Sequence, residues 1–167
     1  MRRISVVVFL VLVSIHTLAL GAPLSLDGHS CIGLSAPIDG EITLNFGPVG
    51  RYAGHWGVDY STSELDAAVR AVASGTVTFT GVVVGNRTVT LDHGGGLKTS
   101  YSFIADAVVR QGQWVQRGSA FGIADPEGAH GALHFSVRID GVYLDPAPLV
   151  GCRSAPPSDG LSLVRPP

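Results

Sequence analysis

The sequence predicts an all-β domain, an antiparallel sandwich-like or barrel-like fold, because three features of its middle part agree. Apolar and polar residues alternate with a period of two in separate short runs, which is the pattern of half-buried strands. Turn-forming glycines separate these runs at the spacing typical of antiparallel folds. No segment carries a sustained helical stripe of apolar residues. With 167 residues, of which 46% are hydrophobic, the chain can bury one core.

The N-terminal residues 1–22 are predicted to be a signal peptide for export. Arg2 and Arg3 precede an almost unbroken apolar stretch at 4–20, and Ala22 ends a group of small residues suited to signal-peptidase cleavage. The alternative is an uncleaved membrane anchor, since roughly 17 apolar residues are at the lower limit for crossing a bilayer. In both cases the rest of the chain is expected outside the cytoplasm.

Three further segments follow the predicted signal peptide. Residues 23–35 are expected to form a linker, residues 36–152 the folded domain, and residues 153–167, rich in Ser and Pro, a disordered tail. Cys31 and Cys152 flank the patterned region, and an exported chain meets an oxidising compartment in which such a pair closes. We therefore predict one disulfide that joins the two ends of the domain.

Between the cysteines, four runs of alternating residues predict strands. They lie at about 76–80, 88–92, 98–103 and 133–140, and glycine-containing turns follow them. In the last run the apolar residues at 133, 135 and 137 face one way. His134 therefore lies on the opposite, polar side of its strand, where a groove can open.

Residues 54–59, Gly-His-Trp-Gly-Val-Asp, contain the first candidate metal ligands. His55 and Asp59 are four residues apart, and the glycine between them lets the backbone bend closely around a bound ion. Together with His134 they make a set of two imidazoles and one carboxylate, which leaves the fourth position of a catalytic zinc ion for water. Trp56 either packs at the floor of the groove or stacks on a bound peptide or sugar.

The sequence resembles the lysostaphin-type (LytM-type) zinc metallopeptidases, which cleave peptide cross-links of bacterial peptidoglycan. The resemblance runs from about residue 36 to residue 150. Five ordered motifs carry it, at 54–59, 72–77, 89–101, 108–122 and 133–138. It implies an antiparallel β fold with an open groove and Zn²⁺ held by His55, Asp59 and His134. It also implies that Tyr101 lies beside the site as a hydrogen-bond donor to a bound carbonyl.

Two departures from the family pattern concern the residues that act on the attacking water. The family has a histidine where this chain has Phe103, and another where it has Ala132. In the family these histidines are thought to position and deprotonate the water and to stabilise the oxyanion. Each group of this kind is worth roughly 10²–10⁴-fold in rate, so we expect hydrolysis to be weak or lost. His130 is the one candidate replacement, and its alternative interpretation is an exposed loop histidine.

Three functions follow from this sequence, of which the first is preferred. It is an exported protein of the bacterial cell envelope that keeps the metallopeptidase fold and zinc without efficient hydrolysis, and that binds peptidoglycan peptides or regulates a cell-wall enzyme. The second is an active zinc metalloendopeptidase that cleaves cross-link peptides. The third is a secreted β domain that binds neither metal nor cell wall. The formal charge of −2 and the single lysine exclude a nucleic-acid partner, and membrane contact is expected only through an uncleaved signal anchor.

Overall fold

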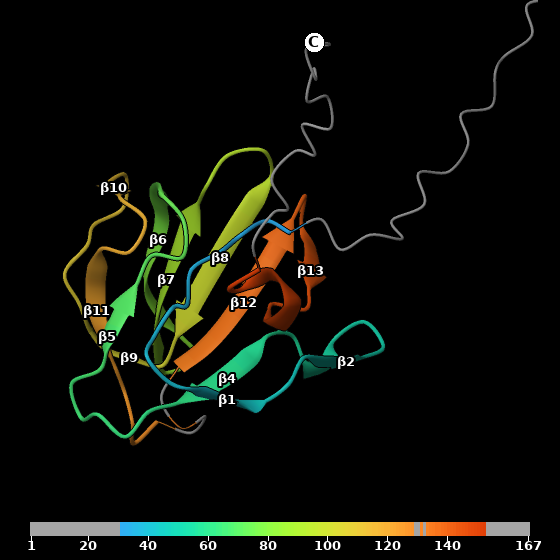
Figure 1. Cartoon of the computed structure of the whole chain (residues 1–167), viewed down its shortest axis with the longest axis horizontal. Coiled ribbons are helices and arrows are strands. Elements are labelled where there is room, and N and C mark those ends of the chain that lie inside the picture. The colour runs from blue at the N-terminus through green and yellow to red at the C-terminus, as the bar shows by residue number, and fades with distance from the viewer. Residues whose placement is uncertain (1–30, 129–130, 132, 153–167) are drawn as a thin grey trace, which may run out of the picture.

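The regular secondary structure of the described residues is almost entirely antiparallel strand, so the predicted all-β class is confirmed. The computed structural model describes residues 31–128, 131 and 133–152 (Figure 1). The predicted signal peptide, most of the predicted linker and the predicted tail lie outside the described residues, and so do His130 and Ala132.

Most strands belong to one eight-stranded sheet. Its members, in spatial order, are β1 (Glu41–Leu44), β4 (Val58–Ser61), β12 (Leu133–Ile139), β8 (Leu97–Ser102), β7 (Asn86–Asp92), β6 (Gly75–Val83) and β10 (Trp114–Val115), with β13 (Val142–Leu144) paired to β12. All the pairings in this sheet are antiparallel, and sequence neighbours β6, β7 and β8 are adjacent, as expected for strands joined by short turns.

Two smaller groups of strands accompany this sheet. One is a three-stranded sheet of β5 (Ala68–Arg70), β11 (Ala120–Ala124) and β9 (Ile104–Ala107), and the other is the hairpin of β2 (Gly47–Val49) and β3 (Ala53–His55). The short 3-10 helix η1 (Ala147–Leu149) follows β13. None of the described residues form a helix that is both long and apolar enough to cross a membrane.

The core lies on one face of the large sheet, next to the three-stranded sheet. Tyr101 of β8, Phe121 of β11 and Phe135 of β12 are fully buried there. The Tyr101 ring centroid is 4.9 Å from that of Phe121 and 5.2 Å from that of Phe135, within the range of favourable aromatic pairs. The alternation in β12 therefore works as predicted, because its odd-numbered residues fill the core and its even-numbered residues face away from it.

The N-terminal boundary of the domain lies earlier than predicted. Leu34, which was expected in the linker, is only 2% exposed and forms an isolated bridge with Val150. Burying this isobutyl side chain removes apolar surface from water, and that gain ties residues 31–35 to the domain. The predicted disulfide between Cys31 and Cys152 is confirmed. It closes a span of 121 residues, so it restricts the unfolded chain strongly.

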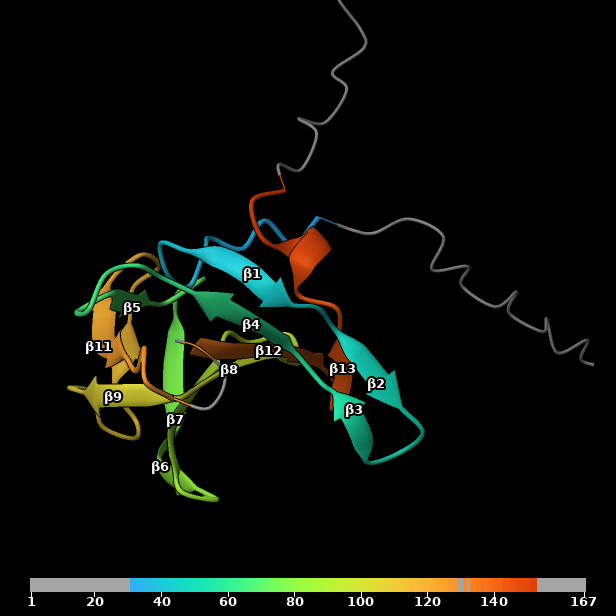
Figure 2. The same ribbon diagram turned by 90° about the horizontal axis from the view of Figure 1, so that it is seen from below.

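Two hairpins project from the same side of the large sheet. Figure 2 shows the β2–β3 hairpin and the outer end of the β6–β7 hairpin on either side of β12 and β8. The β6–β7 turn is Val84-Gly85, and both residues have positive φ angles of 48° and 86°, as in a tight hairpin turn. Residues of both hairpins line the hollows over β8 and β12. The face of β8 and β12 that points away from the core is therefore the floor of an open groove.

Candidate metal centre

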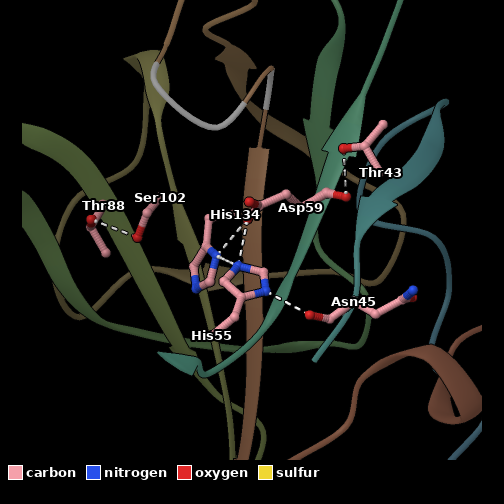
Figure 3. Close-up of polar contacts among 7 residues, drawn as sticks. All are labelled: Thr43, Asn45, His55, Asp59, Thr88, Ser102 and His134. Atoms are coloured by element: carbon pink, nitrogen blue, oxygen red, sulfur yellow. Dashed lines mark hydrogen bonds and ion pairs between the residues drawn. The ribbon is translucent and has the colours of Figure 1, made fainter. Parts of the chain in front are cut away.

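Three side chains from three strands converge on the floor of this groove. His55 ends β3, Asp59 lies on β4 and His134 lies on β12. The Asp59 Oδ1 atom is 2.9 Å from His55 Nε2 and 2.7 Å from His134 Nδ1, and the two nitrogens are 3.0 Å apart (Figure 3). The pairing of β4 with β12 places Asp59 directly opposite His134. The fold thus brings together the three residues that the sequence marked as candidate ligands.

The donor atoms of these residues fit a zinc ion. All three lie within 4.8 Å of one another, and Asp59 is only 2% exposed. Ligand atoms about 2.0–2.1 Å from a tetrahedral ion are about 3.3 Å apart, so the three side chains need to separate only slightly to admit one. Two imidazoles and one carboxylate are also a donor set typical of zinc sites that keep an open position.

A backbone carbonyl sets the tautomer of His55. The His55 Nδ1 atom lies 2.8 Å from the carbonyl oxygen of Asn45. Because that oxygen only accepts, Nδ1 donates its proton to it, and Nε2, which lies beside Asp59, is the nitrogen that would bind a metal ion. A hydrogen bond of this kind orients a metal-binding histidine and raises its basicity. Sequence analysis missed Asn45, because a backbone contact leaves no signal in residue identity.

Gly57 lies between two of the candidate ligands because no side chain fits there. A Cβ atom at this position would lie 2.5 Å from the carbonyl oxygen of Phe135 and 2.8 Å from His134 Nε2. The φ angle of Gly57 is not positive, so its backbone conformation does not itself require glycine. The glycine therefore serves close packing against the His134 ring rather than the backbone bending expected from the sequence.

A Gly57→Ala substitution is expected to weaken zinc binding about tenfold. The added methyl group pushes the His134 ring or the β12 backbone away, and disturbing the support of a metal ligand typically costs 10–100-fold in affinity. Competition against a chromophoric zinc chelator measures the change. Gly47→Ala is the matched control, since a Cβ at Gly47 meets nothing within 4 Å. Equal zinc affinity in the Gly57 variant and the wild type would contradict this explanation.

Phe103 lines the same hollow as two of the candidate ligands, His55 and His134. Strand β8 ends at Ser102, and the φ angle of Phe103 is 64°, in the left-handed region that bulky residues rarely adopt. The hollow is lined by Phe103 together with His55, Trp56 and His134. Among the described residues that line it, His55 and His134 are the only titratable ones. The described residues that line this hollow therefore offer no general acid or base beyond His55 and His134.

Tyr101 does not reach the groove. It is fully buried, its hydroxyl accepts a hydrogen bond from the Val72 N–H at 3.0 Å, and the Thr99 hydroxyl lies 3.2 Å away. Burial raises the pKa of the Tyr101 phenol above its ordinary value. The expectation that Tyr101 donates to a bound carbonyl is wrong, because the odd-numbered positions of β8 face the core.

Trp56 lies at the edge of the groove and packs against its neighbours. Its indole N–H donates to the Ala53 carbonyl at 2.9 Å, and its ring contacts Phe46 and Tyr143 edge-on, with centroid distances of 6.5 and 5.5 Å. The same side chain lines both hollows of the groove. The packing interpretation fits these contacts, and contact of Trp56 with a bound ligand stays a prediction.

The family model described as Peptidase family M23 matches residues 53–146, a range that contains His55, Asp59, Phe103 and His134. A comparison with curated proteins finds no match for the chain.

Solved structures of bacterial proteins share the fold. Csd3 from Helicobacter pylori matches with a TM-score of 0.63 and 24% identity, over 74% of this chain and 34% of that one. A zinc-containing peptidase from Vibrio cholerae matches with a TM-score of 0.57 and 25% identity, over 75% of this chain and 40% of that one. The catalytic domain of lysostaphin from Staphylococcus simulans has a TM-score of 0.57 and 21% identity, over 65% of this chain and 90% of that one. This chain thus spans about a third of the length of Csd3.

Proposed function

Because the chain belongs to peptidase family M23, we propose that it is a zinc-binding protein of the cell envelope that binds peptidoglycan peptides in its groove and hydrolyses them weakly or not at all. The observation that carries this proposal is Phe103 in the hollow that His55 and His134 line, the two histidines whose ring nitrogens lie close to the Asp59 carboxylate. A benzyl ring neither accepts nor donates a proton, so it cannot replace a histidine that acts on water.

Zinc binding is supported by the donor set and its surroundings. The two imidazole nitrogens and the Asp59 carboxylate are close enough to share one ion, and the contact of His55 Nδ1 with the Asn45 carbonyl leaves Nε2 as the nitrogen that lies toward them. The similar peptidase from Vibrio cholerae is described as containing zinc. A bound zinc ion lowers the pKa of its water and polarises a carbonyl, and this chemistry leaves room for slow residual hydrolysis.

Peptide binding is supported by the open groove that runs past the candidate ligands. Its floor carries hydroxyl groups from β7, β8 and β12, and its edges carry Trp56 and Val83. Hydroxyl groups donate to and accept from peptide backbone groups, while the apolar edges suit the side chains of an extended peptide. An extracytoplasmic location is supported by the disulfide between Cys31 and Cys152, since such bonds persist in oxidising compartments.

The second candidate function is an active zinc endopeptidase of peptidoglycan cross-links. The complete set of three candidate ligands favours it, because that set is the part of the site that metal-assisted hydrolysis cannot lose. This function needs a proton-transfer group from outside the described residues, and His130 is the residue that the sequence offers.

Incubation of the zinc-loaded protein with purified insoluble peptidoglycan tests the proposal. We expect the protein to sediment with the peptidoglycan and to release almost no soluble peptide, because binding needs the groove whereas turnover needs groups that the described part of the site lacks. An active family M23 peptidase serves as the positive control for release. Release at the rate of that control would establish the endopeptidase instead. If the protein neither sediments with peptidoglycan nor binds zinc, the third function remains, a secreted β domain that binds neither metal nor cell wall.

A further inference from the structure

The groove floor is a regular grid in which three strands contribute one side chain to each row. The antiparallel registers align β12, β8 and β7 residue by residue. Its three rows are His134–Ser102–Thr88, Ser136–Ser100–Thr90 and Arg138–Lys98–Asp92. The chemistry therefore changes along the groove from a metal-ligand row, through a row of hydroxyls, to a charged row.

The hydroxyls of the first two rows are joined across the strands. Thr88 Oγ1 donates to Ser102 Oγ at 2.9 Å, and Thr90 Oγ1 and Ser100 Oγ are also 2.9 Å apart. These pairs fix the side chains of the floor while leaving each hydroxyl oxygen with further hydrogen-bonding capacity. This part of the floor is polar and uncharged, so it does not distinguish a charged ligand from a neutral one.

In the charged row, Lys98 is already paired with a carboxylate. Its Nζ lies 3.4 Å from Asp92 Oδ2. A hydrogen bond from the Gly94 N–H lowers the pKa of Asp92, and Lys98 lowers it further, so this carboxylate is ionised at neutral pH and offsets the lysine charge. The net positive charge of the row therefore resides on Arg138.

Arg138 is held in place yet keeps free donors. Its Nη2 donates to Ser100 Oγ at 3.3 Å, and its Cζ lies 5.3 Å from the centroid of the Tyr143 ring. A guanidinium has five N–H donors, and these contacts leave most of them unused. Among the described residues no carboxylate lies within ion-pair distance of Arg138, and its side chain lines the groove. The row thus presents a positioned cation that lacks a partner anion in the part of the chain that the structure describes.

We propose that Arg138 binds a carboxylate of the peptide in the groove and makes the protein select peptides that carry one. The inference rests on the proposed peptide-binding function. Arg138 is four residues beyond His134 along one strand, a distance of about 13–14 Å at 3.3–3.4 Å per residue. An extended peptide lying along the strand covers this distance with about four residues. The selected carboxylate is therefore about four residues away from the peptide group at the metal centre.

A matched pair of ligands tests this selection. Cross-linked peptides freed from the glycan of purified peptidoglycan serve as the acidic ligand, and the same peptides with their carboxyl groups converted to amides serve as the neutral one. Isothermal titration of the zinc-loaded full chain measures both affinities. We expect the wild type to bind the acidic peptides about tenfold more tightly, as charge-assisted hydrogen bonds to a partly exposed guanidinium allow.

Three variants separate recognition from folding. Arg138→Gln is expected to bind both ligands equally, at the affinity of the wild type for the amidated peptides, with an unchanged zinc content. Arg138→Lys is expected to keep part of the preference that Arg138→Gln loses, because lysine retains the positive charge but lacks the paired N–H donors of the guanidinium. Arg110→Gln, at an exposed arginine outside the groove, is the matched control and keeps the full preference.

The outcomes distinguish this inference from the proposed function. Equal binding of acidic and amidated peptides by the wild type overturns the role of Arg138 and leaves peptide binding intact. A preference that persists in Arg138→Gln also overturns it. Binding of neither ligand by the zinc-loaded wild type refutes the proposed function, and the inference with it.

Discussion

Replacing Asp59 with asparagine is expected to raise the dissociation constant for zinc by at least about a hundredfold. The carboxylate is buried and lies within 3 Å of both imidazole donors, so it supplies the anionic oxygen of the set. Asparagine keeps the size of the side chain and loses the charge. Removing a group that only orients a metal ligand typically lowers metal affinity 10–100-fold, so removing the ligand itself lowers it more.

Zinc-dependent thermal stability measures this effect independently of activity. Zinc that binds only the folded state raises the melting temperature, and the rise follows the ratio of free zinc to the dissociation constant. The wild type should therefore show a rise that Asp59→Asn lacks at the same zinc concentration. Asp66→Asn, at an exposed aspartate, is the control and should respond like the wild type. An unchanged response in Asp59→Asn would show that the cluster of His55, Asp59 and His134 is not a zinc site.

Introducing histidine at both departures from the family pattern is expected to raise the rate of peptidoglycan cross-link hydrolysis by at least about a hundredfold. The Phe103→His and Ala132→His variant restores two groups, each worth roughly 10²–10⁴-fold when positioned. Phe103 already lines the hollow with His55 and His134, so an imidazole there starts close to the candidate ligands. Histidine also tolerates the left-handed backbone of this position better than phenylalanine does.

Release of soluble peptide from purified peptidoglycan measures the gain. Each single variant should gain less hydrolytic activity than the double variant. Two groups that act together on one water molecule have non-additive effects, so one of them alone gives only part of the gain. Adding Asp59→Asn to the double variant should abolish the gain, which ties it to the metal centre. A wild-type rate equal to that of the double variant would favour the active endopeptidase. A folded, zinc-loaded double variant without any gain would show that the groove lacks more than these two histidines.

Alternation of apolar and polar residues predicted which side chains of the central strands face the core. For Tyr101 it was more reliable than the family resemblance. The period of two in β8 places Tyr101 on the apolar side, together with Thr99. The resemblance placed Tyr101 beside the site, and the structure buries it against Phe121 and Phe135. Local periodicity succeeded here because every side chain of a regular strand is directed by the pleat alone.

Phe103 shows where alternation stops being informative. It has the same parity as Tyr101, so the pattern alone directs it to the core. Its positive φ angle, just after the last residue of β8, turns the chain, and the residue lines the groove instead. The residue type does not predict this backbone conformation, because phenylalanine is uncommon in the left-handed region.

The amino-acid sequence by itself determined the all-β class, the disulfide and the three candidate ligands, because periodicity, cysteine count and residue chemistry are local properties. Only the tertiary structure decided how these residues meet. The pairing of β4 with β12 aligns Asp59 with His134, and the β2–β3 hairpin returns His55 to the same point. Likewise, the three-strand register puts Arg138 at the far end of the groove floor. Register between distant strands depends on the packing of the whole core, and no short stretch of sequence contains that information.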